Sequence, residues 1–157
     1  MAKIKKSIKK QFYEIEAPLT AAKIALYAGS QEELEGKTIK LDLTKNLKGK
    51  NLELKLRIIK EGEKLSCKAE KIELINSYLK KAIRNGADYA EDSFVADCRD
   101  SKARIKPLLV TRKRVSRNTL KILRETARKN LEAYVKTRNV EEIFTEIISN
   151  KLQKQLA

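Results

Sequence analysis

The order of hydrophobic and polar residues predicts three strands in the first half of the chain. The first runs from Lys37 to Leu43, and the second, from Leu52 to Ile58, has the most regular alternation. A third runs from Lys64 to about Lys71, and Glu61-Gly62-Glu63 before it is typical of a hairpin turn. A period of two places successive side chains on opposite faces of a strand. The pattern therefore predicts three antiparallel strands in a meander.

The segments on either side of this meander have different patterns. Gln11 to Ala17 is apolar and β-prone, and Pro18 disfavours helix before it, so we expect a short edge strand or an extended arm. Ala21 to Ala28 could form a brief helix. Apolar residues at three- and four-residue steps from Ile72 to Arg84 predict a helix that Asn85-Gly86 ends.

The sequence after this helix returns to strand patterns. Ser93 to Arg99 and Ala103 to Thr111 flank Asp100-Ser101, which predicts a second hairpin. Pro107 lacks an amide proton, so it places the returning strand at an edge or a bulge. One face of this hairpin is expected to carry Phe94, Ala96 and Cys98.

The last third of the chain has a helical period. Ser116 is a candidate N-cap, followed by an apolar stripe at steps of three and four from Leu120 to Tyr134. Asn139 is the candidate cap of another helix, with two acids in its first turn and an apolar side from Ile143 to Leu152. The predicted fold class is therefore α+β, with an antiparallel sheet that two C-terminal helices cover.

The chain is expected to form one domain with a basic tail. Residues 1–10 contain five lysines and no acid, so we expect a tail that is mobile alone and orders on its partner. The chain has 157 residues and shows no repeat and no Pro/Gly-rich linker, so residues 11–157 are predicted to form a single domain.

Charge determines which partners fit this domain. Thirty-six Lys and Arg stand against 21 Asp and Glu, a net charge of +15, which favours a polyanionic partner. RNA, DNA and an anionic membrane face are the three candidates. The membrane is excluded because a spanning helix needs about 20 consecutive apolar residues, and the apolar stretches here are far shorter. The N-terminus lacks the pattern of a signal peptide, so we expect a cytoplasmic protein.

Catalytic and metal chemistry find little support. The chain has no His, and Cys67 and Cys98 lack the paired spacing of zinc sites, so they are interpreted as free thiols on strands. The motifs of phosphate loops and activated nucleophiles are missing as well. We therefore predict no metal, no cofactor, no small-molecule substrate and no enzymatic activity. The alternative is a magnesium nuclease, for which the candidate ligands are Asp88, Glu91, Asp92, Asp97 and Asp100; pairing with Arg99 and Lys102 or plain solvation explains these acids better.

Positive charge is concentrated in one segment. Eight basic residues and no acid lie between Lys102 and Lys121. Arg104 and Lys106 should share a strand face, and four later cations should follow one side of a helix whose N-terminus can itself bind an anion. A single surface cation is usually just solvated, but an unopposed run predicts phosphate binding. The predicted RNA-binding residues are Lys3, Lys5, Lys6, Lys9, Lys10, Tyr13, Lys48, Lys50, Arg104, Lys106, Arg112, Lys113, Arg114, Arg117, Lys121, Arg124 and Arg128.

Aromatic residues make up only 5% of the chain, which argues against base-by-base reading of single strands. Phe94 and Phe144 are expected in the core. Phe12 and Tyr13, in a basic neighbourhood, are the rings considered near RNA. Recognition through phosphate and shape is therefore the expected mode. A free nucleic-acid chaperone or a DNA-architectural protein remains the alternative function.

One run of residues resembles a known signature. Lys9-Lys10-Gln11-Phe12-Tyr13-Glu14-Ile15-Glu16-Ala17-Pro18 is similar to the N-terminal signature of the archaeal and eukaryotic small-subunit ribosomal proteins of the S-three-A-e type. These are also called eukaryotic-type S-one and are unrelated to bacterial S-one. The likeness continues through Gly36 to Leu43, through Leu52 to Ile59 and through the basic segment to near Leu131.

The resemblance implies a β-barrel-like core with flanking helices. It further implies binding to small-subunit rRNA on the platform near the messenger exit, in support of translation, with neighbouring small-subunit ribosomal proteins as further partners. The chain departs from the family pattern in three places. Phe12 stands where the family usually has Trp, Asp100-Ser101-Lys102 replaces an Asp-Gly-Tyr-like turn, and the family's extended C-terminus is absent after Ala157. This shortness favours an archaeal version over a eukaryotic one.

Overall fold

The strand alternation and the helical stripes belong to two separate compact units. The computed structural model describes residues 9–156 apart from 18, 21, 45–50 and 63. One unit combines Met1–Leu43 with Glu53–Glu73, and we call it the sheet unit. The other combines Thr44–Leu52 with Leu74–Ala157, and we call it the helical unit. The single domain expected for residues 11–157 stays a prediction.

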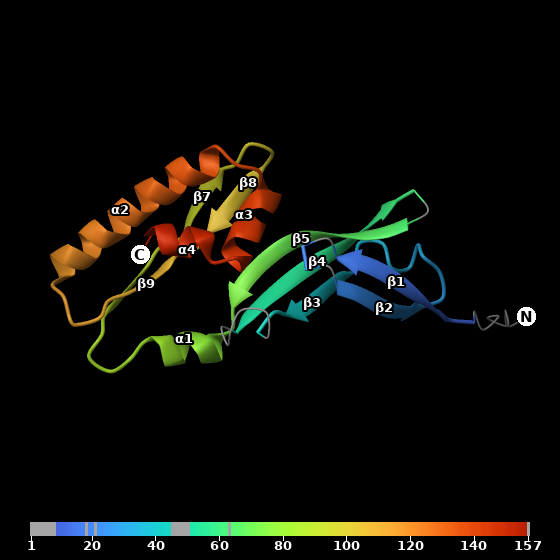
Figure 1. Ribbon diagram of the computed structural model, residues 1–157, viewed down its shortest axis with the longest axis horizontal. Helices are drawn as coiled ribbons and strands as arrows, with labels where there is room; N and C mark the ends of the chain where they lie inside the picture. The colour runs from blue at the N-terminus through green and yellow to red at the C-terminus, as the bar shows by residue number, and fades with distance from the viewer. Residues whose placement is uncertain (1–8, 18, 21, 45–50, 63, 157) are drawn as a thin grey trace, which may run out of the picture. The chain divides into compact units, whose positions relative to one another are not determined.

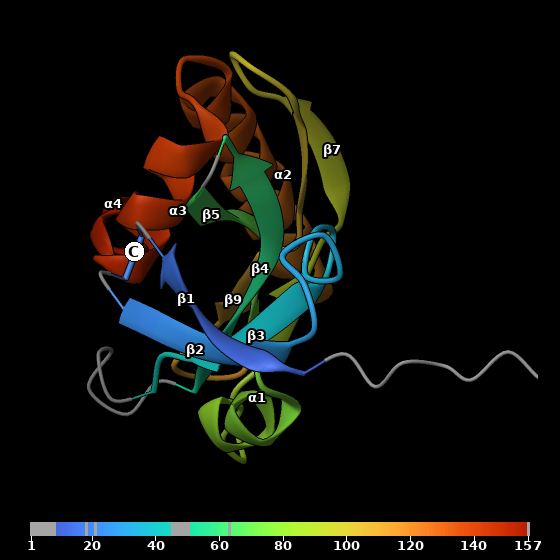
Figure 2. The ribbon, with the colours of Figure 1, turned by 90° about the vertical axis from the view of Figure 1, so that its right-hand side faces the viewer.

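Five strands form the sheet unit (Figures 1 and 2). Their order across the sheet is β2-β1-β5-β4-β3, with β1–β2 and β3–β4 antiparallel and β1 parallel to β5. The sheet curls into an open half-barrel, as Figure 2 shows, so the barrel-like core is confirmed in part. The parallel pair corrects the all-antiparallel prediction. The bounds are β1 Gln11–Ala17, β2 Ala22–Ala28, β3 Thr38–Asp42, β4 Leu52–Glu61 and β5 Lys64–Leu74.

Alternation explains which face of this sheet is buried. Leu52, Leu54, Leu56 and Ile58 of β4 are all at most 5% exposed, whereas the residues between them are half-buried or exposed. Gly62 turns the chain from β4 toward β5 with a φ of +67°, a conformation that costs glycine nothing. Further buried side chains come from the other strands and the loops: Ile15, Ala17, Ala28, Leu34, Leu43, Leu65 and Cys67.

Three expectations for the sheet unit were wrong. Residues 22–28 form strand β2 and no helix, because pairing with β1 lets Ile24 and Leu26 face inward while Lys23 and Tyr27 face outward. As a result β1 is an inner strand, and β2 and β3 are the edges. Strand β5 runs on to Leu74, since the alternation continues past Lys71, so the helix expected from Ile72 is shorter.

The helical unit contains short strands and four helices among the described residues (Figure 1). Strand β7 pairs antiparallel with β8, and β6 pairs antiparallel with β9. Pro107 lies between β8 and β9, so the predicted returning strand is split into two pieces at the proline. The bounds are α1 Asn76–Ala82, β6 Tyr89–Glu91, β7 Phe94–Asp97, β8 Lys102–Ile105, β9 Leu108–Val110, α2 Arg117–Lys136, α3 Val140–Ile148 and α4 Lys151–Leu156.

A second hydrophobic core holds this unit together. Phe94 and Ala96 of β7 are buried against Leu131 and Val135 of α2 and Ile143 of α3. The hairpin face predicted to carry Phe94, Ala96 and Cys98 is therefore confirmed, with Cys98 packed at its border. The C-terminal helices cover these short strands, and α2 contacts β6 and β7.

The C-terminal helices number three among the described residues, where two were predicted. Asn150 has a φ of +58°, and this left-handed residue ends α3 and lets α4 begin at Lys151. Asparagine tolerates that conformation better than most residues. Leu152 therefore lies on α4 and still packs against the same core. No helix in the described part of the chain has the length and apolar character needed to span a membrane.

Candidate nucleic-acid interface

The basic turn Arg112-Lys113-Arg114 joins β9 to α2 and is held at its base by Asp88 and Thr111. The Thr111 amide donates to the Asp88 carbonyl at 2.9 Å, and the Asp88 amide donates to Thr111 Oγ1 at 3.0 Å. The Thr111 hydroxyl also lies 2.7 Å from the Lys113 carbonyl, and the Val115 amide donates to Asp88 Oδ2 at 2.9 Å. These bonds fix both ends of the turn, so its three cations project from an anchored backbone.

The first turns of α2 continue this cationic surface. Ser116 caps the helix as predicted, with its hydroxyl oxygen accepting from the Thr119 amide at 3.2 Å. No acid lies in the first turn, so nothing there neutralises the positive end of the helix dipole. The residues of α2 that are buried are Ala127, Leu131 and Val135, all in its C-terminal half. The N-terminal half is therefore free to present Arg117, Lys121 and Arg124 to solvent.

Two of the predicted helix cations have acidic partners one turn later. Lys121 lies 4.0 Å from Glu125, and Arg128 Nε lies 2.9 Å from Glu132 Oε1. The guanidinium of Arg128 also stacks 5.3 Å from the centre of the Phe94 ring. Its hydrogen bond to Glu132 raises the pKa of Arg128 further above an already high value. The side chain of Arg128 is thus already engaged in contacts within the protein.

Of the cations predicted on the basic turn and on α2, five are exposed and form no ion pair with a described residue. We call them the unpaired basic cluster, which consists of Arg112, Lys113, Arg114, Arg117 and Arg124. Phosphate oxygens suit such a surface, because guanidinium groups and open helix amides both bind them strongly. The cluster is the candidate interface for a nucleic acid.

The remaining predicted site residues lie elsewhere or outside the described residues. Arg104 is exposed on β8, opposite the exposed Val95, and Lys106 is exposed just after the same strand. Lys9, Lys10 and Tyr13 belong to the sheet unit, where Tyr13 is half-buried on the inward side of β1. Their contact with RNA stays a prediction. Outside the described residues lie Lys3, Lys5, Lys6, Lys48 and Lys50.

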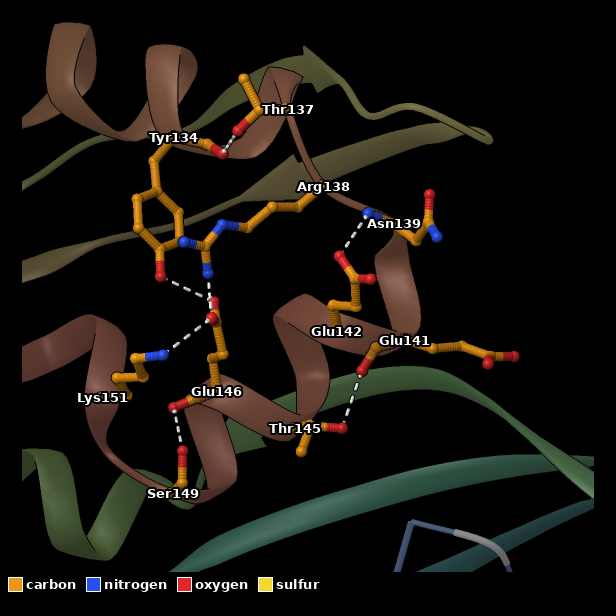
Figure 3. Close-up of polar contacts among 10 residues, drawn as sticks. All are labelled: Tyr134, Thr137, Arg138, Asn139, Glu141, Glu142, Thr145, Glu146, Ser149 and Lys151. Carbon is orange, nitrogen blue, oxygen red and sulfur yellow. Dashed lines mark hydrogen bonds and ion pairs between the residues drawn. The ribbon is translucent and has the colours of Figure 1, made fainter.

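A polar network anchors the C-terminal end of α2 (Figure 3). Glu146 of α3 accepts from Tyr134 Oη at 2.7 Å and from Arg138, and it lies 3.8 Å from Lys151 Nζ. The Arg138 guanidinium also stacks 3.8 Å from the centre of the Tyr134 ring. Burial alone would raise the pKa of Glu146, but the hydrogen bonds and the two positive charges together lower it. This network joins α2, α3 and α4.

The start of α3 and the turn before β8 add local bonds. Asn139 precedes α3 as the predicted cap, and it forms a capping box with Glu142, whose carboxylate accepts from the Asn139 amide at 3.2 Å. Figure 3 shows this pair beside Glu141, the other acid predicted for the first turn. Asp100 Oδ1 accepts from the Val140 amide at 3.2 Å. The helix that follows the cationic helix is therefore tied to the β7–β8 hairpin.

Four of the five acids considered for a magnesium site have structural roles. Asp88 holds the basic turn, Asp100 binds the start of α3, Asp92 accepts from the Ser93 amide at 2.8 Å, and Asp97 lies 3.7 Å from Lys102. Among the described residues, no group of three or more candidate ligands converges on one point. Burial raises the pKa of Cys67 and of Cys98, which fits inert thiols.

Three cations on β3 and β4 of the sheet unit are arranged differently. Lys40 Nζ lies 3.0 Å from Glu53, and Glu70 lies 2.8 Å from Arg57 and 3.7 Å from Lys55. We call Lys40, Lys55 and Arg57 the paired cations. Their charges are balanced by acids on neighbouring strands, so they offer less attraction to a polyanion.

Two features of the surface were not predicted from the sequence. The bond between Asp88 and Thr111 joins residues 23 positions apart, and no local pattern indicates it. Tyr27, which lies directly opposite Phe12, was missed because its segment was interpreted as helical. The outward positions Lys23, Ala25 and Tyr27 have the period of a strand, so that signal was present.

Comparison with known proteins covers nearly the whole chain. The sequence profile of the Ribosomal S3Ae family matches residues 2–157. The protein named small ribosomal subunit protein eS1 from Nanoarchaeum equitans (strain Kin4-M) is 26% identical over 156 residues. That alignment covers 94% of this chain and 79% of the relative.

Proposed function

The chain belongs to the Ribosomal S3Ae family and is a protein of the small ribosomal subunit, and we propose that it binds small-subunit rRNA through phosphate and shape contacts. Its role is structural, as for the family, and supports translation in the cytoplasmic ribosome. The contacts are made by exposed cations on an anchored turn and helix, which suits recognition of backbone over base.

The unpaired basic cluster is the observation that carries this proposal. Five cations stand exposed on one turn and the first turns of one helix, and none of them forms an ion pair with a described residue. Their mutual repulsion costs free energy in the isolated protein, and that cost is removed when phosphates replace their counterions. The chain's net charge of +15 likewise favours binding to a polyanion.

The finer location is part of the proposal. The family resemblance favours the platform of the small subunit near the messenger exit, beside other small-subunit proteins. Arg104, Lys106, Lys9 and Lys10 extend the proposed RNA contacts beyond the cluster, since each is exposed.

Salt dependence of binding tests the role of the cluster. The protein would be titrated with an rRNA fragment at several salt concentrations, beside a variant with Arg112, Lys113 and Arg114 all changed to Glu. Each lost phosphate contact lowers the slope of log K against log salt by roughly 0.7 to 0.9. We expect the slope to fall by about two to three. An unchanged slope and affinity would remove these residues from the interface.

A free nucleic-acid chaperone or DNA-architectural protein would present a similar cationic surface. Sedimentation of a cell lysate separates the two functions. A structural component travels with 30S-type particles, whereas a free binding protein stays in the light fractions or follows DNA. We expect co-sedimentation with the particles.

A further inference from the structure

Two aromatic rings stand exposed side by side on the outward face of the β1–β2 hairpin. Phe12 and Tyr27 are directly opposite each other in the strand register. Their side chains are exposed to 73% and 59%, and the ring centres lie 5.0 Å apart with the planes tilted by 47°. Large rings bury most of their area when they serve the core. This pair contributes its area to the surface.

The inward side of the same hairpin shows that the rings are not displaced core residues. Ile15 and Ala17 of β1 and Ala28 of β2 are at most 1% exposed, so the buried face is complete without them. A shift of one residue in strand register would reverse the faces, and the seven aligned pairs of β1 and β2 fix the present register. The outward position of the rings is therefore a fixed property of the hairpin.

Positive charge surrounds one end of this aromatic pair. Lys10 Nζ lies 5.9 Å from the centre of the Tyr27 ring, and Lys9 is exposed beside it. The loop acid Glu33 is already bonded to the Gly29 amide at 3.1 Å and to Lys37 Nζ at 3.2 Å. These bonds, the one to Gly29 first, lower the pKa of Glu33, and the positive charges of Lys37 and, more weakly, of Lys10 act in the same direction. The rings thus lie near lysines that can bind a phosphate.

The two rings differ in how much of each is covered by neighbouring side chains. Tyr27 has Lys10 over its ring and Phe12 against it, whereas Phe12 has the larger exposed fraction. Phe12 therefore offers the open aromatic face, and Tyr27 supports it from the neighbouring strand. Bases stack on such faces whatever their identity, because each base has a π-face.

We propose that Phe12, backed by Tyr27, is a stacking platform for an unpaired base of rRNA, with Lys9 and Lys10 binding the adjoining phosphates. This inference rests on the proposed function and adds a single-stranded contact to the phosphate and shape contacts of the helical unit. Lysines beside an open ring match a nucleotide, which carries a flat base and a negative phosphate.

Substitutions that keep bulk and remove the aromatic face test the platform. The full chain would be titrated with a 12-nucleotide oligouridylate and, separately, with a 12-base-pair RNA duplex, as native protein, Phe12→Leu and Tyr27→Leu. We expect Phe12→Leu to weaken oligouridylate binding about tenfold and Tyr27→Leu to weaken it less. Duplex binding should stay unchanged for both. Equal oligouridylate affinity of Phe12→Leu and native protein would overturn the inference.

A fluorescent variant gives a second, independent readout. The chain has no Trp, so Phe12→Trp introduces the sole indole and reports on this position alone. It should bind oligouridylate at least as well as native protein, and stacking of a base should quench its emission. Unquenched emission with bound oligouridylate would contradict the platform. A blue shift without quenching upon assembly into the subunit would assign the rings to a protein neighbour and likewise overturn it.

The two proposals fail in distinguishable ways. If native protein binds the duplex with a steep salt slope while Phe12→Leu has no effect on oligouridylate, the platform fails and rRNA binding stands. If native protein binds neither RNA, the proposed function fails and the platform with it. Thermal unfolding of each variant, followed by circular dichroism, checks that the hairpin is intact.

Discussion

Two sets of three or more surface cations, one in each unit, differ in whether acids lie beside them. In the sheet unit the paired cations Lys40, Lys55 and Arg57 lie within 3.7 Å of Glu53 or Glu70. In the helical unit the unpaired basic cluster forms no ion pair with a described residue. Surface ion pairs contribute little to stability but do cancel charge. The placement of acids therefore decides which cations are left for a polyanion.

Anchoring strengthens this difference. The basic turn is bonded to Asp88 through Thr111 and Val115, and the far end of α2 is tied to α3 by the Glu146 network (Figure 3). A cation on a fixed backbone loses less conformational freedom when it meets phosphate than one on a mobile chain. The cluster therefore combines uncancelled charge with preorganised position.

Removing three charges from each region should give the largest contrast. We expect changing Arg112, Lys113 and Arg114 together to Gln to weaken binding of an rRNA fragment about 100-fold at 0.15 M salt, since three phosphate contacts are lost. The matched control changes Lys40, Lys55 and Arg57 to Gln and removes the same net charge. Filter binding or anisotropy measures both. Equal losses would mean that net charge matters and its placement does not.

Breaking the Glu146 network should mainly affect stability. Glu146→Gln removes the charged acceptor of Tyr134 and Arg138, and we expect the free energy of unfolding to fall by about 1–3 kcal/mol. The side chain of Glu146 is only 15% exposed, so water cannot fully replace these bonds. The control Glu141→Gln, on the exposed side of the same helix, should cost only a few tenths. Denaturant unfolding measures both.

The same network predicts how stability depends on pH. The pKa of Glu146 is lower in the folded protein than its ordinary value of 4.5. Its contribution is therefore fully present above pH 4.5 and is lost as the pH falls through the lower folded value. Native protein should lose stability relative to Glu146→Gln over that acidic range. A constant difference between the two down to the folded pKa and below would contradict the assignment.

Thr111→Val tests anchoring without any change of charge. The variant keeps the shape of the side chain but leaves the Asp88 amide without its acceptor, so we expect a loss of about 1 kcal/mol in stability. RNA affinity should fall several-fold while the salt slope stays unchanged, because every cation remains. Thr145→Val, which removes a hydroxyl bond to the Glu141 carbonyl on α3, is the control. If RNA affinity does not change, the anchored turn is not needed for binding.

Glu70→Gln should have the smallest effect. It makes two of the paired cations resemble the unpaired basic cluster. It leaves Lys55 and Arg57 without their acid, so the sheet unit gains one uncancelled charge. We expect RNA affinity to rise by a few-fold at most and stability to fall by less than about 1 kcal/mol. The same binding titration and unfolding experiment measure both. A large gain in affinity would show that the sheet unit already faces RNA.

Local signals explain what the sequence could predict. Strands β3 and β4 were predicted because buried and exposed positions alternate every second residue along a half-buried strand. The caps Ser116 and Asn139 were predicted because a cap lies next to the first turn of its own helix. Strand β2 was missed, since its alanine-rich residues become a strand only through pairing with β1. The break at Asn150 depends on one backbone angle that an apolar stripe does not reveal.

In the candidate site, too, local features were predictable from the sequence and contacts between distant segments were not. The absence of acids around Arg112 to Arg117 is visible in the sequence and predicted an unpaired surface. The ion pairs of Lys121 with Glu125 and of Arg128 with Glu132 are also predictable from the sequence, because residues four positions apart on a helix are neighbours. Only the fold brings Asp88 to Thr111 and Phe12 to Tyr27, because these contacts cross between strands or loops.

A cryo-EM map of the native small subunit would show which cations contact rRNA. We expect Arg112, Arg114 and Arg117 to lie within hydrogen-bonding distance of rRNA phosphate oxygens, while Lys40, Lys55 and Arg57 keep their carboxylate partners. If the cluster instead faces solvent or protein and the rRNA runs along the paired cations, the account is contradicted.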